Sequence, residues 1–195
     1  MRFLLVLASL VLATGQEAKE GTAGDAQKLV TIREIAVEGT RLPGRSVIRL
    51  AQIKVGDQVN FLKLNDALQK VMRSGLISHI DFEYESLPDK ETDVILHMKC
   101  TDEKPVARAS IQIPKVNEDE VWTWLTNVDP IFTRDMPPTE AAIRLYSFWI
   151  GKYVEDHGDP NFKKHSAIMA DASSSSGGNA TDRLVFKVVK LRSGK

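Results

Sequence analysis

The chain has 195 residues, of which 43% are hydrophobic and 27% are charged, a composition typical of one globular domain or of two small ones. Its 26 lysine and arginine residues balance its 26 aspartate and glutamate residues. The basic excess for which nucleic acids and anionic membrane surfaces select is therefore absent.

The first residues predict an exported protein. A positive charge at Arg2 precedes an apolar run over residues 3–13, and small residues follow it. This pattern predicts a signal peptide over residues 1–15. The alternative, an uncleaved membrane anchor, needs about 20 apolar residues and the run is shorter. A polar, flexible leader is expected over residues 16–28, and we expect the mature protein to be periplasmic or secreted.

The next segment, residues 29–104, predicts a small module. Apolar and polar residues alternate over 29–38, with a slip near Arg33 that indicates a bulge, and again over 80–87 and 93–99. Two helices are expected between the first two strands. Ser46 is the expected N-cap of the first helix, and Asn60 or Lys63 begins the second. The predicted order is strand, helix, helix, strand, strand.

The rest of the chain, residues 105–195, predicts the same order of elements. A strand begins at Ala107, Asn117 can cap a third helix, and Thr139 can cap a long fourth helix that reaches about Asp156. Two further strands close the segment. The expected fold class is α+β, with two tandem β-α-α-β-β modules, each a three-stranded sheet covered by two helices.

The first module resembles a POTRA (polypeptide-transport-associated) domain, the module found in BamA-type outer-membrane assembly factors. The residues that carry the resemblance are the strand end Ile35-Ala36-Val37-Glu38-Gly39, the helix and turn from Ile48 to Asp57, and the segment Val71-Met72-Arg73-Ser74-Gly75 with the strand start Ile80-Asp81-Phe82. The second module looks like a degenerate copy. The chain is expected to stand alone, without a membrane barrel.

The resemblance implies a role in outer-membrane or envelope protein assembly or transport. Its partners would be envelope or outer-membrane polypeptides, or a barrel or secretion component. Nucleic acid is not expected as a partner, and neither is a direct membrane span.

Strand 80–87 is the predicted binding site for polypeptide. In a POTRA-like sheet this strand lies at an edge, where its backbone could accept an extended peptide as an additional strand. The candidate site residues are Ile80, Phe82, Tyr84 and Leu87. The alternative is an edge blunted by the acidic residues Asp81, Glu83 and Glu85.

Three tryptophans form a second candidate interface. Trp122 and Trp124 are two residues apart and cannot share one helix face, so one of them is expected to be exposed or to lie between the modules. Trp149 lies on the long aromatic helix. The alternative function is therefore a structural adaptor that docks on a single membrane-protein partner through the helix over residues 139–156.

Catalytic, metal and cofactor sites are not predicted. Cys100 is the only cysteine, follows alternating apolar residues, and is expected to be a buried hydrophobe. The histidines match no zinc spacing, although His79 and His97 could face each other on adjacent strands. Because no acid, base and nucleophile converge, we do not expect an enzyme.

Overall fold

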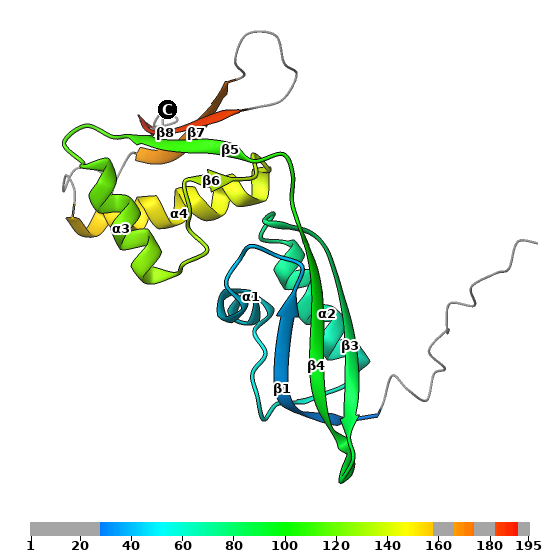
Figure 1. Cartoon of the computed structure of the whole chain (residues 1–195). Helices are drawn as coiled ribbons and strands as arrows, with labels where there is room; N and C mark the ends of the chain where they lie inside the picture. Colours follow the sequence, from blue (N-terminus) through cyan, green and yellow to red (C-terminus); the bar gives the residue numbers. More distant parts are fainter. Residues whose placement is uncertain (1–27, 158–165, 174–181, 191–195) are drawn as a thin grey trace, which may run out of the picture.

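The computed structural model describes residues 28–157, 166–173 and 182–190. These residues form two α+β modules joined end to end (Figure 1), which confirms the expected tandem fold. The predicted signal peptide at 1–15 lies outside the described residues, and so does the predicted leader except for its last residue.

The first module has one mixed sheet with two helices on one face. Its elements are β1 (Val30–Glu38), α1 (Gly44–Ala51), β2 (Gln58–Val59), α2 (Phe61–Met72), β3 (Ile77–Leu87) and β4 (Lys90–Asp102). The strand order is β2-β1-β4-β3, with β1 parallel to β4 and β3 antiparallel to β4. The register of β1 shifts between Ile32 and Glu34, which confirms the predicted bulge.

The second module repeats this topology. Its elements are β5 (Ala107–Gln112), α3 (Glu118–Val128), β6 (Asp135–Met136), α4 (Glu140–His157), β7 (Ser166–Ser173) and β8 (Arg183–Lys190). The strand order β6-β5-β8-β7 is that of the first sheet, and β5 again runs parallel to the last strand, β8.

Each described sheet has a fourth strand that the sequence analysis did not predict. β2 pairs with the first two residues of β1, and β6 pairs with the first two residues of β5. Both strands are only two residues long. A strand this short cannot show the alternation of apolar and polar residues by which strands are recognised in a sequence.

The helix starts follow local side-chain chemistry at three of the four predicted positions. The Asn60 side chain accepts a hydrogen bond from the Lys63 amide at 3.0 Å, and Asn117 accepts one from the Asp119 amide at 2.9 Å. Thr139 Oγ1 accepts one from the Ala142 amide at 3.2 Å. The prediction for Ser46 was wrong, because α1 begins at Gly44 after Pro43 and Ser46 is buried.

Instead of capping a helix, Ser46 makes a buried polar contact between the modules. Its hydroxyl donates to an Asp129 carboxylate oxygen at 2.5 Å, so it joins α1 to the end of α3 in the other module. Arg49 donates to the other carboxylate oxygen of Asp129 at 2.9 Å. Asp129 is only 6% exposed, and these contacts compensate for the loss of its hydration.

The loop between α2 and β3 makes a second junction between the modules. Gly75 has a φ of +70° and lies against the first turn of α4, where Thr139 donates a hydrogen bond to its carbonyl oxygen. The next residue, Leu76, is 4% exposed and belongs to the hydrophobic core of the second module. The modules are therefore joined by polar and apolar contacts besides the connecting chain.

Candidate functional site

The strand β3 forms one edge of the first sheet. In the described residues it pairs only with β4, on one side (Figure 1). The backbone N–H and C=O groups on its other side therefore have no partner strand in the described sheet. The structure thus places the predicted strand 80–87 at an edge, while its binding of polypeptide stays a prediction.

The candidate side chains on β3 become more exposed along the strand. Ile80 is buried in the core, Phe82 is partly buried, and Tyr84 is 46% exposed. These three residues lie opposite Cys100, Met98 and Leu96 of β4. Leu87 follows a shift in register and is partly buried. The outer half of β3 therefore presents aromatic side chains to solvent on the helix-covered face of the sheet.

The first turn of α2 extends this aromatic surface. The Phe61 ring lies 5.8 Å from the Phe82 ring, centroid to centroid, and Phe61 is 52% exposed. Leu62 beside it is 64% exposed. The sequence analysis missed both residues, although two apolar residues ahead of the buried helix positions Leu64 and Leu68 were a usable signal.

The opposite face of β3 carries the acidic residues, each beside a lysine or histidine side chain. Lys99 pairs with Glu83 at 2.7 Å, His79 lies 2.8 Å from Asp81, and His97 lies 3.8 Å from Glu85. The hydrogen bond to Glu83 raises the pKa of Lys99 above its usual value. Because Lys99 offsets the charge of Glu83, the acidic residues of β3 repel another strand less than their number in the sequence suggests.

The two β-strand histidines do not face each other. His79 lies opposite Thr101, and His97 lies opposite Glu83. In the part of the chain that the structure describes, no group of three or more His, Cys, Asp or Glu residues could hold a metal ion. Cys100 is buried, and burial raises the pKa of its thiol to about 11, which disfavours the reactive thiolate.

The three tryptophans divide between core and surface. Trp122 is 5% exposed and donates its indole N–H to Glu118 at 3.0 Å. Trp124 and Trp149 are half-buried and lie together, with ring centroids 6.1 Å apart, between α3 and α4. Trp124 is thus the more exposed member of the Trp122 and Trp124 pair, but it is half-buried within the second module rather than fully exposed or between the modules. Its role at an interface stays a prediction.

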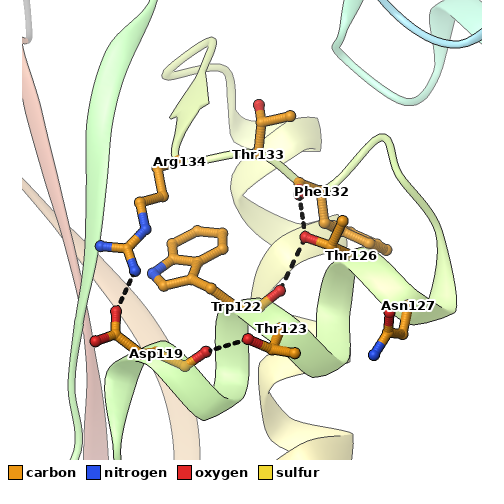
Figure 2. Close-up of a pocket in the computed structure, with 8 residues that line it drawn as sticks. All are labelled: Asp119, Trp122, Thr123, Thr126, Asn127, Phe132, Thr133 and Arg134. Atoms are coloured by element: carbon orange, nitrogen blue, oxygen red, sulfur yellow. Dashed lines mark hydrogen bonds and ion pairs between the residues drawn. The ribbon is translucent and has the colours of Figure 1, made fainter.

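A shallow hollow of about 450 Å³ lies beside Trp122 on α3 (Figure 2). Its lining residues are Asp119, Trp122, Thr123, Thr126, Asn127, Phe132, Thr133 and Arg134. The Arg134 guanidinium lies 5.7 Å from the centre of the Trp122 ring and pairs with Asp119. The hollow therefore already contains a cation held by an aromatic ring and a carboxylate.

None of the helices in the described ranges is both long and apolar enough to cross a membrane. No family model matches the chain, and no curated protein matches it. The comparison with solved structures does find matches, and the three described next share 10–14% sequence identity with this chain.

The first match is the N-terminal domain of Omp85 from Thermosynechococcus elongatus, with 14% identity and a TM-score of 0.39 over 82% of this chain. The chain spans only 62% of that structure. POTRA1-2 of Omp85 from Anabaena matches with 13% identity and a TM-score of 0.38, covering 85% of this chain and 98% of that one. POTRA3-5 of BamA from Haemophilus influenzae matches with 10% identity and a TM-score of 0.37, over 86% and 68% of the two chains.

The topology of each module agrees with the resemblance found in the sequence. Apart from the two-residue strands β2 and β6 between the helices, both modules have the order strand, two helices and two strands, with the first long strand parallel to the last. The chain is thus a tandem of two modules with one shared topology, the order of elements that the resemblance to POTRA domains implies.

Proposed function

We propose that the chain is a periplasmic polypeptide-binding or scaffold protein in outer-membrane or envelope protein assembly or transport, and that it binds clients by strand addition to β3. The observation that carries the proposal is the position of β3, which pairs only with β4 in the described sheet. The envelope setting rests on the resemblance to POTRA domains and on the POTRA-like topology.

Strand addition uses the backbone for affinity. The strand β3 has 11 residues, and an incoming strand would pair with its outward N–H and C=O groups. Because every residue type except proline carries both a backbone N–H and a C=O group, many client sequences could bind. This property suits a protein that handles unfolded polypeptides.

Side chains on and beside β3 would give the site a preference for certain client sequences. Phe82, Tyr84 and the neighbouring Phe61 provide an exposed apolar surface beside the outer half of the strand. A client strand with alternating apolar residues, as in an outer-membrane strand, would place those residues on this surface. Its polar residues would then meet the ion-paired face with Glu83 and Lys99.

Photo-crosslinking in the native cell tests the proposal. A photoreactive amino acid is placed in turn at each position from 80 to 87, and the adducts are identified by mass spectrometry. The control position is Lys99, which is also exposed but lies on β4, a strand paired on both sides by β1 and β3. We expect adducts with envelope polypeptides at alternating positions of β3 and none at position 99.

If probes on β3 give no adducts and only probes at positions 122, 124 or 149 do, the result would contradict strand addition. It would favour the alternative function, a structural adaptor that docks on a single partner. The exposure of Phe148, at 57%, is the feature of α4 that favours docking by this helix. Tyr146 and Tyr153 of the same helix are buried in their own module. Copurification separates the two functions, since an adaptor would retain one stoichiometric partner and a client-binding protein would retain many.

A further inference from the structure

An open cleft of about 440 Å³ lies between α3 and α4, next to the hollow beside Trp122, with which it shares Asp119, Thr123 and Asn127. Its lining residues are Asp119, Glu120, Thr123, Trp124, Asn127 and Tyr153. The cleft thus combines two carboxylates with two large aromatic rings. It belongs to the second module and stands apart from the β3 edge.

The hollow in Figure 2 shows what this combination of groups holds within the same protein. Glu118 and Trp122 are one helical turn apart on α3, and the indole N–H donates to the Glu118 carboxylate. The Arg134 guanidinium lies over the Trp122 ring (Figure 2). It also lies 3.8 Å from the Glu118 carboxylate. Aromatic ring and carboxylate together bind a guanidinium here.

Glu120 and Trp124 repeat this pair two residues further along α3. They have the same four-residue spacing, and two residues correspond to a rotation of roughly 200° about the helix axis. The second pair therefore faces α4, where the Tyr153 hydroxyl lies 3.5 Å from Glu120 and the Tyr153 ring lies 5.6 Å from the Trp124 ring.

The second pair differs from the first in what occupies it. Among the described residues, no lysine or arginine pairs with Glu120 or lies over the Trp124 ring. The His157 ring stacks on Tyr153 at 4.6 Å and lies 6.2 Å from the Trp124 ring. It forms part of the aromatic wall and makes no ion pair with Glu120.

We propose that the cleft lined by Glu120, Trp124 and Tyr153 binds an arginine side chain of a partner polypeptide. Glu120 supplies negative charge, and the half-buried Trp124 ring supplies a flat surface on which a guanidinium can stack. Lysine, a compact and strongly hydrated cation, binds the same cleft more weakly. The site gives the second module a role in partner recognition that does not depend on strand addition.

Indole N–H signals in the NMR spectrum of the ¹⁵N-labelled full chain test the proposal. The Trp124→Phe variant identifies the Trp124 signal. The probe is acetyl-Gly-Arg-Gly-amide, and its control is the same peptide with citrulline, which has the shape of arginine without its charge. We expect the arginine peptide to shift the Trp124 signal to saturation, and the citrulline peptide to leave it in place.

The matched variants are Glu120→Gln and Glu118→Gln. Glu120 accepts hydrogen bonds of 3.5 Å from Asn117 and Tyr153 but pairs with no described cation, whereas Glu118 belongs to the pair that holds Arg134. Glu120→Gln should raise the Kd of the arginine peptide about threefold to tenfold, whereas Glu118→Gln should leave it unchanged. An equal effect of the two variants, or equal shifts with arginine and citrulline, would overturn the proposal. So would binding that appears only in a Lys163→Gln/Lys164→Gln variant, since the chain's own lysines would then be the occupants.

Discussion

The Thr139 hydroxyl, which caps α4 in the second module, donates a hydrogen bond to the carbonyl oxygen of Gly75 in the first module at 3.0 Å. One side chain therefore fixes both the start of a helix and the position of the loop before β3. The strand that we propose to bind clients begins two residues after that loop contact.

Replacing Gly75 by alanine should destabilise this junction. A Cβ at this position would lie 2.8 Å from the Ala142 amide nitrogen, and the φ of +70° is unfavourable for any residue with a Cβ. We expect a loss of about 2–4 kcal/mol in the free energy of unfolding, measured by urea denaturation. The control is Gly56→Ala, with φ +93° and no atom within 4 Å, which should lose only about 1 kcal/mol. Equal losses of unfolding free energy in the two variants would show that the close contact with α4 does not contribute to the effect of Gly75→Ala.

Asp129→Asn should weaken the other contact between the modules. The substitution keeps the size of the side chain but removes the charge that Arg49 and the Ser46 hydroxyl meet in a buried position. Because Arg49 itself is largely exposed, we expect a loss of only about 1–2 kcal/mol in the free energy of unfolding. The surface pair between Glu140 and Arg144 provides the comparison, and Glu140→Gln should cost less than about 0.5 kcal/mol. A smaller loss for Asp129→Asn than for Glu140→Gln would be inconsistent with a role at the junction.

Alkaline pH should remove the contribution of Tyr146 to stability. Burial raises the pKa of Tyr146 to about 12, and its hydroxyl donates to the Ile131 carbonyl oxygen and accepts from the Thr133 amide. The folded state holds this proton more tightly than the unfolded state, in which tyrosine has a pKa of about 10. Stability from this group is thus complete below pH 10 and falls as the pH rises from 10 towards 12.

The measurement compares the wild type with Tyr146→Phe by urea denaturation at several pH values. Near pH 8 the variant should be less stable by about 1–3 kcal/mol, because two buried backbone groups lose their partner. The difference should shrink above pH 10, by at most about 1.4 kcal/mol per pH unit. The exposed Tyr84 serves as the control, and Tyr84→Phe should show no such convergence. A constant difference for Tyr146→Phe would rule out the proposed linkage.

Phe61→Ala should reduce client binding more than it reduces stability. Phe61 is half exposed and contacts the ring of Phe82 beside the β3 edge, so its removal takes apolar surface from the proposed site. We expect the yield of crosslinks from position 84 to fall roughly threefold or more, with a loss of about 1 kcal/mol in stability. Phe148→Ala removes an equally exposed phenylalanine from the other module and should leave that yield unchanged. A fall in both variants would point to a general effect on the fold.

The long elements of the fold could be predicted because their patterns are local. Alternation defined β3 and β4, and the caps at Asn60 and Asn117 marked α2 and α3. Ser46 could not be placed, because its partner Asp129 is 83 residues away and no local pattern records such a contact. For the same reason the sequence could not show that Trp122 is buried. Its burial depends on contacts with Glu118 and with Arg134, and Arg134 is carried by a loop.

The position of Leu76 has a consequence for how the chain melts. This residue precedes β3 of the first module, yet it fills part of the core of the second, so neither module can unfold without leaving a void or an exposed leucine in the other. The two modules should therefore lose their structure together on heating, in a single calorimetric peak. A chain cut after residue 104 would have no such neighbour, and its first module would carry an uncovered leucine at the surface.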